Sequence, residues 1–158
     1  MMPPGGGHAM AAPGKLASRG MRIVGGLVDV VILVVIFGII ALIFISAGDA
    51  RLLPGFFEHR LLTLAGLLSA VIDIAYFAYF WSSRGASIGM MPFGFKVRDV
   101  ATGQYPTMGK AALRGFIWTL EYALTFCLIG VLGWLWMLWD PQKQAIHDKV
   151  AGTIVTTS

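Results

Sequence analysis

The sequence predicts an all-α integral membrane protein, and two observations favour this fold class. Of the 158 residues, 57% are hydrophobic and 13% are charged. Soluble domains carry roughly 25% charged residues, so a soluble fold of this size would lack the polar side chains needed to cover its surface. The apolar residues are also gathered into long runs with basic residues at their ends, which is typical of helices that cross a bilayer.

Two runs, at residues 23–46 and 62–81, are long and apolar enough to predict transmembrane helices. The first follows a short basic segment but lacks a convincing cleavage site, so we interpret it as an uncleaved signal-anchor helix. The second ends in a cluster of aromatic residues, as expected at a membrane–water interface. Residues 1–14 are rich in proline and glycine and predict a disordered tail before a membrane domain at 15–157.

A third apolar segment, at residues 115–139, is interrupted by Gly130 and Gly133. It is too short for two full spans of about 20 residues each, so it either crosses once or returns as a re-entrant hairpin. Short β-prone stretches lie near residues 93–100 and 150–157. A hairpin would bring the two stretches to one side of the membrane, where they can pair, and this slightly favours the return.

The basic residues predict the orientation. The connection at residues 82–115 holds five of the twelve Lys and Arg residues, and three more precede the first span. This asymmetry predicts a multi-pass protein of the cell membrane with a cytoplasmic N-terminus. The basic residues flank apolar runs instead of forming a block, so we expect the lipid bilayer, and not nucleic acid, to be their partner.

Each apolar segment contains one carboxylate, namely Asp29, Asp73 or Glu121. An ionised carboxylate inside a span costs at least about 2.5–3.5 kcal/mol on insertion scales, so each needs a partner, a proton or water. Carboxylates desolvated beside one another have raised pKa values and can exchange a proton for a cation. The alternative is that each is neutral, or pairs with Arg22 or Arg114, and fixes helix packing.

Two parts of the sequence carry a resemblance to a known family. The first is Arg22 followed by Asp29 where the first apolar run begins, and the second is the closing segment at 143–155, which contains Asp148. Together they resemble the RDD family of small membrane proteins, which is named for one arginine and two aspartates. The resemblance covers about residues 16–156, and it implies that Arg22, Asp29 and Asp148 are the family motif.

A glycine-rich segment at residues 85–97 is similar to the family's middle segment, and the chain departs from the family pattern at two positions. Met90 stands where members often carry a lysine, and Lys143 stands where an arginine is common. The first departure removes a basic group from the loop. The second keeps the charge but loses the planar fork of a guanidinium group.

The resemblance implies a transport role, with cation/proton exchange suggested for some members and an accessory or assembly role in larger membrane complexes for others. Arg114 and His147 are candidate supporting residues. His147 and Asp148 can form an imidazole–carboxylate pair, although adjacent residues on a helix point about 100° apart. The alternative is that Asp148 binds backbone groups and a basic partner.

The enzyme classes are poorly supported. The sequence contains no nucleophile elbow, phosphate-cradling loop or HExxH zinc motif, so we expect neither catalysis nor a cofactor. Gly25 and Gly26 are more plausibly positions where another segment approaches the first helix closely. Three short segments enclose little interior, so we expect a homo-oligomer or a larger membrane complex.

Overall fold

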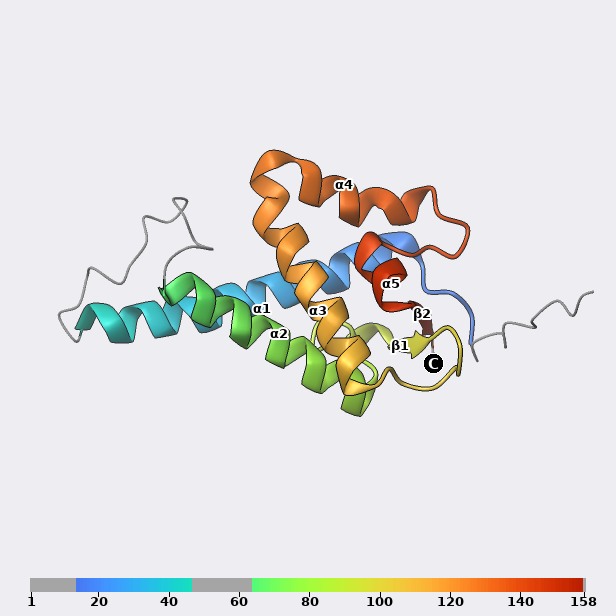
Figure 1. Ribbon diagram of the computed structural model, residues 1–158, viewed down its shortest axis with the longest axis horizontal. Coiled ribbons are helices and arrows are strands. Elements are labelled where there is room, and N and C mark those ends of the chain that lie inside the picture. Colours follow the sequence, from blue (N-terminus) through green and yellow to red (C-terminus); the bar gives the residue numbers. More distant parts are fainter. Residues whose placement is uncertain (1–13, 47–63, 158) are drawn as a thin grey trace, which may run out of the picture.

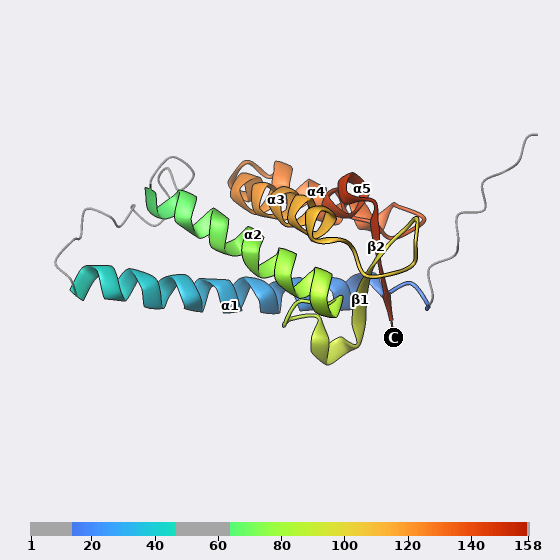
Figure 2. The same ribbon diagram turned by 60° about the horizontal axis from the view of Figure 1, so that its bottom comes forward.

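The computed structural model describes residues 14–46 and 64–157, and within them the protein is mostly helical (Figure 1). The predicted tail at 1–14 lies outside the described residues, apart from Gly14. Helices α1 (Arg19–Ser46) and α2 (Leu64–Arg84) run in opposite directions along the long axis of the molecule. Figure 2 shows α1 on one side of the molecule, the later helices on the other, and α2 crossing obliquely between them.

The first predicted span is a continuous helix in the structure. The stretch Arg19–Ile39 of α1 has a mean hydropathy of 2.5, and it is the one stretch within the described residues that is long and apolar enough to cross a membrane. Its side chains are largely exposed, with Val31 61% and Val35 55% accessible. The second predicted span corresponds to α2, but residues 62 and 63 lie outside the described part of the chain.

Helix α3 (Met108–Ala123) packs along α2 through a glycine and several aromatic side chains. Gly115 lies against α2, where an added Cβ would come within 3.3 Å of Phe77 Cβ. The Phe77 and Trp118 rings lie with centroids 4.5 Å apart, and Phe77 stacks on Trp81 at 4.4 Å. These buried rings form the core between the two helices.

The third apolar segment folds as a helical hairpin. After the 3-10 turn η4 (Leu124–Cys127), the chain reverses at Leu128, whose φ of 61° is left-handed. Helix α4 (Ile129–Leu135) and the 3-10 turn η5 (Trp136–Leu138) then run back from this turn (Figure 1). The chain path therefore follows the returning alternative and not the single crossing.

A small sheet closes the molecule and makes the all-α description incomplete. Strand β1 (Phe95–Asp99), which follows the 3-10 turn η3 (Met91–Phe93), pairs antiparallel with β2 (Thr153–Thr157), so that Val97 faces Val155. Leu16 bridges to Thr156 just before α1 begins. The pairing of the two β-prone stretches is confirmed, and it brings the start of α1, the connection after α2 and the end of the chain together.

Candidate functional site in a buried arginine–aspartate cluster

Asp148 is the centre of a buried ionic cluster. It lies at the third position of α5 (Ile146–Ala151) and its side chain is fully inaccessible. Its Oδ1 atom accepts hydrogen bonds from Nε and Nη2 of Arg114 at 2.9 and 2.6 Å. Its Oδ2 atom accepts from Arg22 Nη2 and, at 3.0 Å, from the backbone N–H of Ala145. One carboxylate therefore joins α1, α3 and α5.

The charge of Asp148 is fixed by its neighbours. Burial by itself raises the pKa of the carboxyl group, but the positive charges of Arg22 and Arg114 outweigh burial and hold the pKa well below its ordinary value. Asp148 is thus ionised at any physiological pH. An Asp148 carboxylate that stays ionised suits a permanent ionic partner of the two arginines and not a group that takes up and releases protons.

Arg22 makes a second contact that explains the departure at position 143. Its Nη1 atom donates to the backbone carbonyl of Lys143, a residue held in the left-handed region with a φ of 53°. The contact uses the backbone, so an arginine side chain at that position is not required for it. The second contact of Arg114 is a cation–π interaction: its guanidinium carbon lies 3.8 Å from the centroid of the Trp81 ring.

Asp29 is held apart from the arginines. Its Oδ1 atom accepts from the Tyr76 hydroxyl at 2.9 Å and from the backbone N–H of Gly89 at 2.8 Å, and its Oδ2 atom accepts from the Ser87 hydroxyl at 2.5 Å. The alternative in which Asp29 pairs with Arg22 is wrong, because Arg22 binds Asp148 instead. The three donors to Asp29 were missed from the sequence, although the glycine-rich segment at 85–97 was a signal that could have indicated two of them, Ser87 and Gly89.

Glycines allow the loop and the hairpin to approach α1. An added Cβ on Gly89 would lie 2.8 Å from Asp29 Cγ, and one on Gly26 would lie 2.7 Å from the Trp134 ring. A Cβ added to Gly25 would lie 3.3 Å from the carbonyl oxygen of Gly89. The predicted close approach at Gly25 and Gly26 is therefore confirmed.

Glu121 and His147 form a second buried pair. The His147 Nδ1 atom lies 2.7 Å from Glu121 Oε2, and the His147 backbone N–H donates to Glu121 Oε1 at 3.2 Å. Gly133 leaves room for the Glu121 side chain, since a Cβ there would lie 2.9 Å from Oε1. The His147 Nε2 atom is 3.8 Å from Asp148 Oδ1, so the closer partner of His147 is Glu121 and not its neighbour in sequence.

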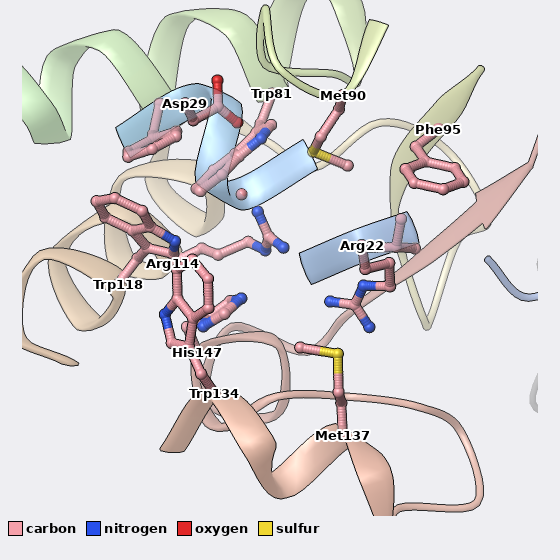
Figure 3. A pocket seen from close by; sticks show the side chains of 13 residues that line it. Arg22, Asp29, Trp81, Met90, Phe95, Arg114, Trp118, Trp134, Met137 and His147 are labelled. Carbon is pink, nitrogen blue, oxygen red and sulfur yellow. The ribbon is translucent and has the colours of Figure 1, made fainter. Parts of the chain in front are cut away.

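A cavity of about 40 Å³ lies between these groups (Figure 3). Its charged and titratable lining residues are Arg22, Asp29, Arg114 and His147, and Met90 contributes a thioether. In Figure 3 the two guanidinium groups and the His147 ring turn toward the same space.

The structure does not place the three predicted ion-binding carboxylates together around this cavity. Asp29 lines the cavity, and Glu121 reaches it through His147. Asp73 is buried on α2 and does not line it. Within the described ranges 14–46 and 64–157, no three His, Cys, Asp or Glu side chains are arranged to hold a metal ion.

Fold and site define a small, mostly helical protein with a strongly apolar first helix, in which a buried Arg–Asp–Arg cluster ties the helices to the C-terminal segment. The model of the RDD family matches residues 16–152, and the chain belongs to the RDD family. Of the three residues predicted to be the family motif, Arg22 and Asp148 are in direct contact, and Asp29 anchors the glycine-rich loop.

The relatives found are partial matches. An uncharacterized protein of Rickettsia prowazekii is 30% identical over 88 residues, which cover 56% of this chain and 46% of the relative. The proline-rich antigen of Mycobacterium leprae is 29% identical over 57% of this chain and 34% of its own length, and the proline-rich antigen homolog of Mycobacterium tuberculosis is 30% identical over 60% and 36%. The matched part is thus less than half of each relative. No solved structure matches the chain.

Proposed function

We propose that this chain is a non-catalytic, multi-pass protein of the cell membrane that acts as a transporter or a transport component. The single observation that carries the proposal is a polar cavity inside a protein whose exterior is apolar. Charged groups line the cavity, while the outward faces of α1 and of the α3–α4 hairpin expose large apolar side chains such as Leu27, Val31 and Ile129. Lipid is the solvent that suits such an exterior.

The proposed orientation places the N-terminus and the sheet in the cytoplasm. The sheet joins residues from the start of α1, the basic connection and the chain end, so one side of the membrane would hold all three. The test is a Lys96→Cys variant in a Cys127→Ala background. An impermeant thiol reagent should label it after the membrane is permeabilised and leave it unlabelled in intact cells. Labelling of intact cells would reverse the orientation.

Cation/proton exchange is the narrower form of the transport proposal. Of the three intramembrane carboxylates, Asp29 is the best candidate because it lines the cavity. Its three donors leave about one of four lone-pair positions open for a cation or a proton. Asp29→Asn keeps the size and hydrogen-bonding capacity of the side chain but removes its titratable charge.

The flux experiment uses purified protein in vesicles with a pH-sensitive dye. If Asp29 carries the exchange, Asp29→Asn should abolish cation-dependent proton flux while the protein still accumulates. Asp73→Asn is the matched control, since Asp73 is also buried but does not line the cavity, and its flux should be close to that of the parent. Unchanged flux in Asp29→Asn, or no flux in the parent, would remove this form of the proposal.

An accessory or assembly subunit is the second candidate. The exposed apolar side chains at the tip and end of the hairpin favour it, because Leu128 and Trp139 are 70% and 71% accessible and a protein partner would cover them as well as lipid does. Purification in a mild detergent followed by native mass spectrometry tests this candidate. A stoichiometric partner or a defined homo-oligomer would support it, and a monomer would count against it.

A further inference from the structure

We propose that the cavity beside Arg114 is a binding site for a small monovalent anion of the size of chloride. The inference goes beyond the proposed function, because it holds whether or not the protein moves a solute. It is carried by buried hydrogen-bond donors that have no acceptor within the described part of the chain, one of them on a charged guanidinium group, and by the size and walls of the cavity.

The first step is the unused donors. Arg114 is 2% exposed, and its Nε and Nη2 atoms are committed to Asp148, but its Nη1 atom has no partner among the described residues. The indole Nε1 of Trp81, which stacks on the same guanidinium group, is also without an acceptor there. A buried donor without an acceptor is costly, and more so on a charged group. Both residues line the cavity, so an occupant that accepts hydrogen bonds would satisfy them.

The second step is the charge. Arg22 and Arg114 share the single carboxylate of Asp148. Glu121 forms its closest contact with His147, although its negative charge also acts on Arg114. Asp29, the acidic group of the wall, takes its hydrogen bonds from Tyr76, Ser87 and Gly89 and none from an arginine in the described part of the chain. The carboxylates therefore leave the Nη1 donor of Arg114 unused, and an anion in the cavity accepts from this charged donor more strongly than a neutral occupant does.

The third step is the fit. A single water needs about 10–15 Å³ of such space, so about 40 Å³ accommodates one small anion or about three waters. Aromatic rings of Phe77, Trp118 and Trp134 form much of the wall. These rings lower the local dielectric, which strengthens an arginine–anion contact. A large organic anion such as gluconate exceeds this space, and this difference gives the test.

The experiment measures thermal unfolding of the purified full chain in a mild detergent. Sodium chloride is replaced stepwise by sodium gluconate at constant ionic strength. A ligand that binds the folded state stabilises it by mass action, so the midpoint should rise with chloride and follow a saturating curve. Equal midpoints in the two salts would show that only water fills the cavity and would overturn the proposal.

Variants locate the effect. Arg114→Lys keeps the positive charge but loses the guanidinium fork, so the apparent chloride affinity should fall about tenfold or more. Trp81→Phe keeps the ring but loses the N–H group, and the affinity should fall roughly threefold to tenfold. Arg84→Gln, at an exposed arginine of α2, should leave it unchanged.

These variants also decide against the proposal if it is wrong. A chloride effect of the same size in Trp81→Phe as in the parent would assign the effect to another part of the protein. If Arg114→Lys does not fold, the comparison of the two salts on the parent and on Trp81→Phe still gives the answer.

Discussion

Replacing Asp148 with asparagine should be among the most destabilising single changes in this protein. The carboxylate accepts four hydrogen bonds, three of them from Arg22 and Arg114, and it is fully buried. Asparagine offers one acceptor oxygen and points an NH₂ group toward guanidinium donors. Removing one partner of a buried ion pair costs about 3–5 kcal/mol, and this carboxylate serves two arginines, so we expect the upper part of that range.

The expected loss is large compared with a typical stability of about 5–15 kcal/mol. A loss of about 4 kcal/mol raises the ratio of unfolded to folded protein roughly a thousandfold, since each 1.4 kcal/mol is a factor of about ten. The assay is unfolding of the detergent-solubilised protein by titration with sodium dodecyl sulfate, followed by tryptophan fluorescence. Reduced accumulation in cells is the accompanying readout.

A double variant tests the reason for the loss. Adding Arg114→Gln to Asp148→Asn removes one of the two unpaired charges, so it should recover part of the stability. Asp148→Glu keeps the charge and should cost less than Asp148→Asn. A loss below about 1 kcal/mol in Asp148→Asn, or no recovery in the double variant, would refute the view that the carboxylate neutralises two buried cations.

Three further predictions use the same unfolding assay. Gly89→Ala should cost about 1–3 kcal/mol because its Cβ would press on Asp29, whereas Gly20→Ala, with nothing within 4 Å, should be neutral or slightly stabilising; equal effects would contradict the close approach. Tyr76→Phe should cost about 1–3 kcal/mol, since it removes a donor to Asp29 and the acceptor for a backbone N–H, and a cost near zero would mean that water replaces both. The pKa of Asp148 is lower in the folded state than the value of about 3.9 in the unfolded state, so the carboxylate stabilises the fold fully above that pH and less as the pH falls. The free energy of unfolding of the parent should therefore decrease below about pH 4. Asp148→Asn should lose that part of the pH dependence.

The sequence alone determined the elements whose signal is local. The apolar run that forms α1 predicts a helix whatever it packs against, because a backbone away from water must form its hydrogen bonds within its own segment. The two β-prone stretches were also readable from their local sequence. Their pairing could be predicted because an isolated strand leaves its backbone N–H and C=O groups without partners. Membership of the RDD family was also readable from the sequence, in part because the closing motif is contiguous, and it is confirmed.

Only the tertiary structure decided which charge meets which. Arg22 and Asp29 share a helix face in the sequence pattern, but seven residues place them about 10 Å apart along the axis, too far for an ion pair. Arg22 instead meets Asp148, 126 positions away, and Glu121 meets His147 across 26. Such partners depend on how the hairpin folds back over α1, which no local pattern encodes, and for the same reason the cavity between the two arginines became visible only once the chain was folded.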